Sequence, residues 1–579
     1  MSTLNPEDLM DILRITKANC KNCYKCLREC PVKSIGFKHD QAEILDADCI
    51  YCGHCLSVCP QKAKHINSEL PDVKDMIRRG ERVYVSLAPS FIAAFPEYDF
   101  PAMTAALKKL GFVHAEETAV GADAVTREYE RIMREHKMKN IIATCCSSTV
   151  LLVEKYFPEL IPQLAPVASP MLAHARMLRE IYGPRIKVVF IGPCVAKKHE
   201  AQFPTSENAV SAVITFDDLA LWFAEENVTF EEKDPEARTM KNPLPRFYPV
   251  PGGIIRNIIP EYRSIYNCVS ADGIEACMEI LHSLADNRIS NYFLELSVCP
   301  GSCADGPGMA SFHTSRLASK EHVIRHVTTR QKGQPSLTEG TRIKIGAAYN
   351  DLSPDRVPAS AEAIQQVLLS MGKTSPDKEL NCGCCGYSSC RTKAQAVIDG
   401  KATVTMCLPF FREKAESLSN LIVDSSPNAI IMTDSNFCIQ EYNPAARKLL
   451  GPALDQHRGD PIFDILEADI YARVLSGAKN ILGEKVHYER LGLIVKQSVL
   501  ALRDNDSYLI LMEDITYSEK QKSERMSVNE KTVDIAQKVI DKQMRVAQEI
   551  ASLLGETTAD TKTALSKLKK SILDEMSEH

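Results

Sequence analysis

The amino-acid sequence predicts a multidomain protein of mixed α/β and α+β class, and three observations support this prediction. The chain has 579 residues, which is more than one hydrophobic core normally contains. Apolar strand-like runs alternate with helical stretches in the centre of the chain, as in an α/β body with parallel strands. Cysteines gather in tight groups on both sides of that body, and the part beyond them reads as a small α+β domain. The predicted segments are residues 1–75, 80–375, 376–412, 413–518 and a polar, helical tail at 519–579.

Charge and hydropathy argue against two classes of partner. The net charge of −6 comes without a polybasic stripe, so nucleic acid is not an expected partner. No apolar run reaches the roughly 18–20 residues that span a bilayer, so we expect no membrane partner. Residues 1–17 lack the basic-then-apolar layout of a signal peptide, which predicts a cytoplasmic protein. In such a chain, 21 cysteines in CxxC-type groups indicate thiolate metal ligands rather than disulfides.

The first 75 residues carry the same cysteine pattern twice, C-x2-C-x2-C-x3-C-P. In this spacing three thiolates hold one cubane and the fourth reaches across to a second cubane. Paired zinc ribbons use two CxxC knuckles instead, so the pattern resembles a bacterial two-cluster ferredoxin domain, whose role is electron transfer. The predicted ligands are Cys20, Cys23, Cys26 and Cys59 for one [4Fe–4S] cluster, and Cys49, Cys52, Cys55 and Cys30 for the other.

Three cysteine motifs in the central segment each follow an apolar run that ends in a loop. The runs are Ile141–Ala143, Val188–Ile191 and Phe293–Leu296. The carboxyl ends of parallel strands meet at one edge of a sheet, so the cysteines after these runs should converge. A helix predicted at Val150–Phe157 would aim its N-terminus at an anionic cluster there.

These motifs resemble the three signatures of the [FeFe]-hydrogenase catalytic domain, T-S-C-C-P, M-P-C-x2-K-x2-E and E-x3-C-x-G-G-C. The resemblance implies a two-lobed α/β domain that holds the H-cluster, which is a [4Fe–4S] cubane joined to a two-iron subsite with CO, CN⁻ and azadithiolate. The implied cubane ligands are Cys146, Cys194, Cys299 and Cys303, the last of which also bridges to the two-iron subsite.

The resemblance also implies roles for other residues around the H-cluster. Cys145 would pass protons to the bridging amine, and Lys197 would give an ammonium group to one cyanide. Ser90 would hydrogen-bond the other cyanide, and Glu295 completes the third signature. Other residues implied at the cofactor are Ala88, Pro89, Gly192, Pro193, Ser297 and Met171. An alternative is a cubane without the two-iron subsite, as in the hydrogenase-like iron–sulfur assembly proteins of eukaryotes; Lys197, Glu295 and the Cys145-Cys146 pair favour the full cluster.

Several positions depart from the family pattern. Gly192 and Ser297 stand where the family has Met, and Met171 stands where it has a Gln near a CO ligand. The family's relay Glu and relay Ser fall at Tyr129 and Ala165, which leaves a proton on Cys145 without a familiar next carrier. Nearby acids that could serve are Glu116, Glu128 and Glu130. These departures predict slow or biased H2 cycling and are similar to those of the sensory, PAS-containing subgroup.

The second cysteine group has the spacing C-x2-C-x4-C-x16-C. It is similar to the small four-cysteine [4Fe–4S] domain of RnfB-type electron-transfer subunits, which would be the third cluster besides the H-cluster. Glycines let the backbone fold closely around a cubane, and a helix at Arg391–Gly400 would return the chain to the last ligand. The predicted ligands are Cys382, Cys385, Cys390 and Cys407. Cys384 could replace Cys382, and a zinc site is the alternative.

The C-terminal third resembles a PAS domain. Its opening strand ends in Met432-Thr433-Asp434, and Asn443 with Pro444 forms a good helix start. Such domains dimerise and carry signals, and haem binding would have His457 or His487 as its histidine ligand. In the tail, a heptad seam and a second apolar set predict either a helical hairpin packed on the PAS domain or a dimerising output stalk. The seam is Ile540, Met544, Ala547, Ala551 and Leu554, Gly555 would end that helix, and the second set is Leu565, Leu568 and Ile572.

The sequence thus predicts an H2-sensing [FeFe]-hydrogenase that interconverts H2 with protons and electrons. The expected partners are H2, protons, a ferredoxin or other redox protein, a signalling phosphatase or kinase, and a second copy of the chain. The alternatives are a metabolic, ferredoxin-linked hydrogenase and a non-catalytic iron–sulfur electron-transfer or scaffold protein.

Overall fold

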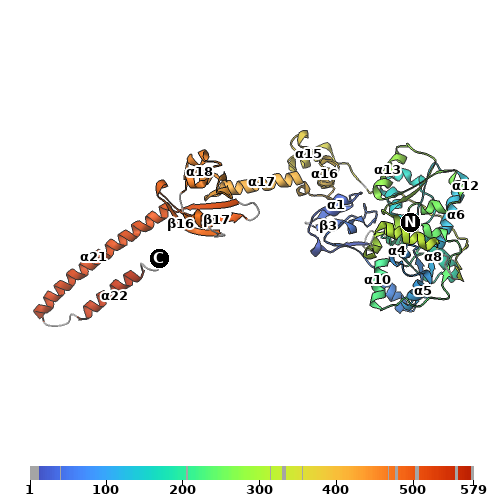
Figure 1. Cartoon of the computed structure of the whole chain (residues 1–579), viewed down its shortest axis with the longest axis horizontal. Helices are drawn as coiled ribbons and strands as arrows, with labels where there is room; N and C mark the ends of the chain where they lie inside the picture. The colour runs from blue at the N-terminus through green and yellow to red at the C-terminus, as the bar shows by residue number, and fades with distance from the viewer. Residues whose placement is uncertain are drawn as a thin grey trace. The chain divides into compact units, whose positions relative to one another are not determined.

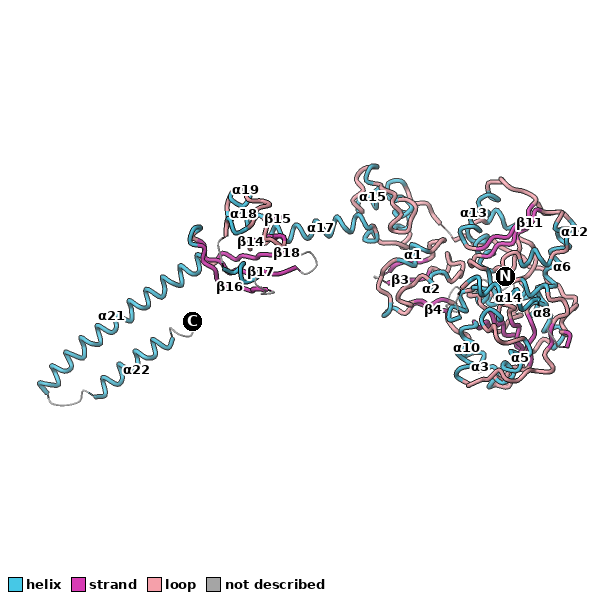
Figure 2. Tube along the Cα trace, in the orientation of Figure 1, coloured by secondary structure: helices cyan, strands magenta, loops and turns pink. Residues whose placement is uncertain are grey.

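The structure is a computed structural model of the chain, and it divides into two compact units, Met1–Phe410 and Phe411–His579, which are described separately. It describes residues 12–38, 41–203, 206–312, 315–328, 334–354, 356–466, 469–475, 480–502, 507–554 and 559–575. Figure 1 labels the elements along the chain and Figure 2 marks the helices and strands.

The N-terminal cysteine segment folds as two similar halves. Strand β1 (Leu13–Ile15) pairs with β4 (Lys64–Ile66), and β2 (Ile35–Lys38) pairs with β3 (Gln41–Ile44), both antiparallel. Each cysteine run leads into a short helix, α1 (Lys25–Glu29) or α2 (His54–Ser57). Left-handed backbone recurs at equivalent positions of the two halves, in the pairs Asn22 and Tyr51, Tyr24 and Gly53, and Lys33 and Lys62. The repeated spacing therefore fixes a repeated backbone path around two thiol groups.

Two parallel sheets form the central body. The first has the strand order β6 (His114–Glu117), β5 (Val83–Leu87), β8 (Lys187–Gly192) and β9 (Ala212–Thr215). The second has the order β11 (Asn267–Asp272), β12 (Tyr292–Ser297) and β7 (Ile141–Ile142). All five residues of β5 are buried, as expected for a strand covered by helices on both faces. The predicted α/β class is thereby confirmed.

Helices flank these sheets and begin with recognisable caps. Ser169 accepts a hydrogen bond from the Leu172 amide before Pro170, and Thr215 forms a capping box with Asp218. The helix predicted at 150–157 starts earlier, at Ser147, because Cys146 takes the N-cap position and the polar residues after it are helical. The main helices are α3 (Leu70–Arg78), α5 (Phe100–Lys109), α6 (Ala119–Glu135), α7 (Ser147–Tyr156), α8 (Pro170–Tyr182), α9 (Ala196–Gln202), α10 (Phe216–Glu225), α11 (Gly253–Asn257), α13 (Ile274–Ala285) and α14 (Arg316–Thr328).

The cysteine-rich ends of the first unit are tied to its central body. One hydrophobic core includes Leu27 and Ile50 of the N-terminal halves together with Leu152 of α7. The buried Asp48 accepts hydrogen bonds from Arg356 Nη2 at 2.8 Å and Lys401 Nζ at 2.7 Å, so three segments meet at one carboxylate. Around the second cysteine group lie α15 (Ala361–Ser370), α16 (Cys390–Ile398) and the start of α17 (Leu408–Ser425).

The second unit contains a five-stranded antiparallel sheet, in the order β15 (Ile439–Tyr442), β14 (Ala429–Asp434), β18 (Ser507–Asp514), β17 (Leu493–Leu502) and β16 (Asn480–Tyr488). Figure 1 shows β16 and β17 as neighbouring strands of this sheet. The Asn443 carboxamide oxygen accepts from the Ala446 amide at 2.9 Å and so caps α18 (Pro444–Leu450), as predicted. Two further helices are α19 (Ala453–Gln456) and α20 (Asp469–Leu475).

The tail forms two helices, α21 (Thr516–Leu554) and α22 (Ala559–Glu575), which lie side by side in Figure 2. Ile540 and Met544 of the predicted seam line a cavity together with Leu565 of α22. The seam therefore faces a helix of the same chain, as in the predicted hairpin. Gly555 and the side chains of Ala551 and Leu554 lie outside the described residues. Among the described residues, no helix combines the length and the apolar character that crossing a membrane requires.

Candidate iron–sulfur centres and active-site cavity

The two N-terminal groups of thiols are gathered as the spacing predicts. Burial raises the pKa of Cys26, and negative charge on Cys23 and Cys59 raises it further, so these sulfurs lie close together. Burial likewise raises the pKa of Cys52 to about 12, and charge on Cys49 and Cys30 adds to the effect. Cys59 therefore lies near Cys26 and Cys30 lies near Cys52, as the predicted crossing requires, while the ligand sets themselves stay a prediction.

The central cysteines line one cavity of about 80 Å3. Loops after β5, β7, β8 and β12 supply its walls, because the carboxyl ends of both parallel sheets face it. Residues predicted at the cofactor that line this cavity are Ala88, Pro89, Ser90, Cys145, Cys146, Met171, Pro193, Cys194, Lys197, Ser297, Cys299 and Cys303.

Several thiols of this cavity have pKa values far above the usual value. Burial raises the pKa of Cys194 to about 11 and that of Cys145 to about 12, in each case against the opposing charge of Lys197. Burial raises the pKa of Cys299 and Cys303 well above the usual value. Such thiols stay protonated unless a cation takes the place of their protons, which is what binding to a metal cluster does.

The cavity also has polar atoms that call for a ligand. Among the described residues, Ser90 Oγ and Ser302 Oγ are buried and have no hydrogen-bond partner. The Lys197 ammonium group donates to the Cys145 carbonyl oxygen at 3.2 Å and to Glu200 Oε2 at 2.5 Å. Two buried hydroxyls without partners, an ammonium group and part-buried thiols therefore fit an anionic, thiolate-bound metal group with polar ligands of its own.

Two predicted residues do not line the cavity. Glu295 lies on β12 and accepts hydrogen bonds from the backbone at the start of α11, including the Ile255 amide at 3.0 Å. Burial raises the pKa of its carboxyl to about 7. Gly192 ends β8, where an added Cβ would come within 2.7 Å of the Phe190 ring. Since Phe190 itself lines the cavity, its ring occupies the space that a larger residue at 192 would need.

The positions of the expected proton relay are fully buried. The Tyr129 phenol accepts from the Thr144 amide at 2.9 Å, and burial raises its pKa above the usual value. Ala165 has no polar side-chain atom to offer. The cavity linings do not include Glu116, Glu128 or Glu130. Glu116 instead sits in a buried network with Ser336 and Thr338, and although burial raises its pKa, the hydrogen bond with His114 and the nearby His174 ring hold the pKa well below the usual value.

Several lining residues were not predicted from the sequence. Tyr248 and Pro249 come from a segment without any motif, and Thr118 and Ala122 come from the start of α6. Ser302 could have been found, because it lies directly before a predicted ligand. Tyr248 and Pro249 were not marked by any local spacing, since they reach the cavity only through the fold.

The second cysteine group lines a small cavity of its own, of about 20 Å3. Its lining includes the predicted Cys382, Cys385, Cys390 and Cys407, and also Cys384. Cys382 and Cys384 are both exposed, so the choice between them stays a prediction. Helix α16 begins at Cys390, close to the predicted start at Arg391.

The second N-terminal group of thiols, which contains Cys30 and Cys52, has the central cavity and the second cysteine group as neighbours. Charge on Cys52 acts on Cys299 of the central cavity, and a Cβ on Gly53 would come within 2.6 Å of Pro307. Lys33 is affected by charge on both Cys30 and Cys385, although burial is the main cause of its lowered pKa. The group with Cys30 and Cys52 therefore lies beside both the central cavity and the second cysteine group.

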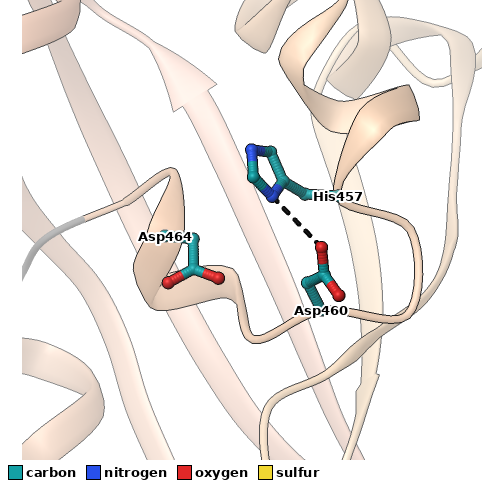
Figure 3. A group of neighbouring side chains, drawn as sticks. All are labelled: His457, Asp460 and Asp464. Atoms are coloured by element: carbon teal, nitrogen blue, oxygen red, sulfur yellow. Dashed lines mark hydrogen bonds and ion pairs between the residues drawn. The ribbon is translucent and has the colours of Figure 1, made fainter.

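His457 and His487, the histidines that haem could use, lie in the second unit. Figure 3 shows His457 facing Asp460, with Nδ1 3.3 Å from Oδ2, and Asp464 beside them. This cluster is partly exposed, and a group of exposed acids is common without a metal ion. The weak sequence support for haem binding therefore gains nothing from this cluster.

Family models match four parts of the chain. Residues 81–307 match the iron-only hydrogenase large subunit, C-terminal domain. Residues 12–60 match a 4Fe-4S dicluster domain, residues 379–409 an Fe–S cluster family, and residues 423–519 the PAS fold. The cysteine-lined cavity lies mainly within the segment that matches the iron-only hydrogenase domain. Residues 81–307 thus match a domain of iron-only hydrogenases and residues 423–519 match the PAS fold, and both matches agree with the resemblance to PAS-containing [FeFe]-hydrogenases.

Curated relatives are hydrogenases of low identity. The periplasmic iron hydrogenase large subunit of Nitratidesulfovibrio vulgaris is 30% identical over 263 residues, which cover 40% of this chain and 62% of that protein. Subunit HndD of the NADP-reducing hydrogenase of Solidesulfovibrio fructosivorans is 25% identical over 354 residues, which cover 51% and 56%. The chain thus spans less than two thirds of the length of these relatives. The cytoplasmic location remains a prediction.

Solved structures were also matched. A variant of the [FeFe]-hydrogenase HydA1 from Chlamydomonas reinhardtii is 16% identical with a TM-score of 0.40, and the match covers 50% of this chain and 100% of that one. The PAS domain of the HTR-like protein from Haloarcula marismortui is 22% identical with a TM-score of 0.15, and the match covers 18% and 99%.

Proposed function

We propose that this chain is an [FeFe]-hydrogenase that interconverts H2 with protons and electrons at an H-cluster, slowly enough to serve as an H2 or redox sensor. One observation carries the proposal: four part-buried thiols, a fifth thiol, an ammonium group and two buried hydroxyls without hydrogen-bond partners line one cavity. When bound, the two-iron subsite would supply the centre at which H2 is split.

The chain's own residues would hold and orient that group. Cys146, Cys194, Cys299 and Cys303 would be the cubane ligands, while Lys197 and Ser90 would donate hydrogen bonds to its polar ligands. Helix α7 begins directly after Cys146, so its N-terminal dipole would favour the anionic cluster. Met171 and Phe190 would exclude water on one side. Cys145 would hold the proton next to the reacting centre.

Electrons would leave through three [4Fe–4S] clusters. The cluster of Cys30 and Cys52 would form a junction, since its ligands lie beside the central cavity and beside the second cysteine group. The cluster of Cys20 and Cys23 would be an outer terminal, because Cys23 is exposed. Exposed basic side chains surround this terminal, and Glu29 is the one exposed acid within six residues of its ligands. The basic set is Arg14, Lys17, Lys21, Lys25, Arg28 and Lys62.

An acidic redox protein such as a ferredoxin is therefore the proposed electron partner, and the double variant Lys17→Glu/Lys21→Glu tests this. At low salt we expect the second-order rate of cluster reduction by an acidic ferredoxin to fall by about tenfold or more, because steering by opposite charge is lost. The difference should shrink as salt rises, since the Debye length is about 10 Å at 0.1 M. Lys241→Glu, exposed in the central body, is the matched control. Equal loss in both variants, or no salt dependence, would contradict this docking site.

The PAS domain and the tail would report the redox state to a partner such as a signalling phosphatase or kinase. A second stripe on α21 is exposed and supports a homodimer: Val528, Ile535, Val539, Val546 and Ile550 recur at spacings of seven and four residues. The residues of this stripe are not those of the seam, in which Ile540 and Met544 face α22.

The second candidate function is an electron-transfer protein with cubanes and no two-iron subsite. The departures at Tyr129 and Ala165 favour it, because they remove the expected proton relay. The thiol Cys145 and the ammonium group of Lys197 favour the hydrogenase, since a cubane alone requires neither group.

Infrared spectroscopy separates the two functions. After supply of the two-iron subsite, the protein is expected to acquire iron-bound CO and CN⁻ bands that shift under H2. Cys299→Ala should lose these bands, because a cubane ligand is missing, whereas Cys268→Ala, a part-buried cysteine outside the cavity, should keep them. Protein that holds iron–sulfur cubanes but never gains the bands would establish the second candidate.

A further inference from the structure

A second cavity, of about 60 Å3, lies next to the active-site cavity, and Ser147 lines both. A water molecule needs roughly 10–15 Å3 of such space and two to four polar partners. The second cavity therefore has room for several waters. The polar residues on its walls are Thr144, Ser147, Glu154, His199, Glu200 and Tyr349.

One carboxylate connects the polar groups of the two cavities. Glu200 Oε2 accepts from Ser147 Oγ at 2.6 Å and from Lys197 Nζ at 2.5 Å. Lys197 lines the active-site cavity and Glu200 lines the second one. A proton that reaches the Ser147 hydroxyl or the Lys197 ammonium group is thus one hydrogen bond away from the second cavity.

Glu154 stands between the second cavity and the surface. It lies on α7 seven residues after Ser147, which puts both side chains on one face of the helix. Its carboxyl is buried, and Oε1 accepts from the Asn350 amide at 2.9 Å. Asn350 is exposed, and so is Ala348, which lines the cavity. The cavity therefore leads from Glu200 past Glu154 to exposed residues.

The groups around Glu154 bring the pKa of its carboxyl close to neutral pH. Burial raises the pKa of its carboxyl to about 7, and charge on Glu200 adds to this while Lys155 and the Asn350 amide oppose it. The other titratable groups facing the cavity are His199 and Tyr349. Burial lowers the pKa of His199 to about 4 and raises that of Tyr349 well above its usual value, so both stay neutral at pH 7. A carboxyl matched to the ambient pH is suited to taking up and releasing protons.

We propose that Ser147, Glu200 and Glu154, with water in the second cavity, carry protons between the active-site cavity and the surface; this rests on the hydrogenase function proposed above. On the outward path, the Ser147 O–H bond breaks as an O–H bond forms on the Glu200 carboxylate, and a proton from the first cavity re-forms the Ser147 hydroxyl. Water relays that proton, so the Glu200 O–H bond breaks and an O–H bond forms on Glu154. Solvent water then takes the proton from Glu154. Each group returns to its starting charge, and the electrons leave separately through the cubanes.

This route replaces the relay that the family resemblance leads one to expect. Tyr129 and Ala165 occupy the expected relay positions, and neither offers a carboxyl or hydroxyl on the second cavity. The acids Glu116, Glu128 and Glu130 also lie off both cavities. Hydrogen bonds connect Glu200 to Ser147 and Lys197, and the second cavity connects Glu200 to Glu154.

The test uses the full chain with Glu154→Gln, Glu154→Asp and, as a matched control, Glu159→Gln, an exposed acid on the same segment. Turnover of H2 in Glu154→Gln should fall by about 100-fold and lose its dependence on pH near neutrality, while Glu154→Asp recovers part and the control is unchanged. An independent readout is the carbonyl absorption of a protonated carboxylic acid. In protein with cubanes alone, part of this band should titrate near neutral pH and disappear in Glu154→Gln, while the part from Glu295, whose pKa is also raised to about 7, remains.

The outcomes distinguish this proposal from the function on which it rests. Wild-type protein without CO and CN⁻ bands would overturn both. Intact bands together with unchanged turnover in Glu154→Gln would overturn the proton route alone. The route would also be overturned if the titrating carboxyl band kept its full wild-type intensity in that variant.

Discussion

Replacing Cys145 with alanine is expected to lower H2 turnover by about 100-fold or more while leaving the CO and CN⁻ infrared bands in place. General acid–base catalysis by a positioned group contributes roughly 10²–10⁴-fold, and the Cys145 thiol is the group placed for it. It lines the cavity with the four predicted cubane ligands but is not one of them. The measurement is turnover per infrared-active site, so that incomplete loading does not count as lost catalysis.

The matched control for Cys145→Ala is Cys277→Ala. Cys277 is a buried thiol whose Sγ donates to the Ser297 carbonyl oxygen, and it does not line the cavity. The control should keep both its bands and its turnover. Loss of the bands in Cys145→Ala would show that this thiol is a ligand and not a proton carrier. Full turnover in that variant would mean that protons reach the site without it.

The sequence predicted most of what depends on local spacing. The paired left-handed residues of the N-terminal halves follow from the repeated cysteine runs, and the cap at Asn443 follows from the residue pair Asn443-Pro444. The central cysteines were placed correctly on one cavity, because strand ends of parallel sheets meet at the same edge.

What the sequence could not provide depends on contacts between distant segments. The second cavity combines Glu154 from α7, Glu200 from α9 and Tyr349 from a loop, and no spacing links these positions. Glu295 completes a signature motif, yet its carboxyl is turned to the backbone of α11 and away from the cavity lining. The seam on α21 was visible as a heptad, but only the structure shows that its partner is α22.

The largest stability effect is expected at the Glu117–Arg246 pair. Arg246 Nε and Nη2 donate to the two oxygens of Glu117, each at 2.6 Å, and both side chains are almost completely buried at 3% and 1% exposure. The pair joins the end of β6 to the segment that precedes Tyr248 in the cavity wall. Glu117→Gln leaves the guanidinium charge buried without its counter-ion, which typically costs about 3–5 kcal/mol.

Because the chain has several domains, hydrogen exchange is the appropriate measure of this loss. Amide protection of residues 244–250 should fall sharply in Glu117→Gln, and the CO and CN⁻ bands should weaken as the wall at Tyr248 loosens. Glu128→Gln removes one of the two partners of Arg131 at the surface, where a pair contributes only about 0–1 kcal/mol, so its protection should match wild type. If both variants behaved alike, the buried pair would not be what holds this wall, and the geometry of the cavity would have to depend on the cysteine-bound cluster itself.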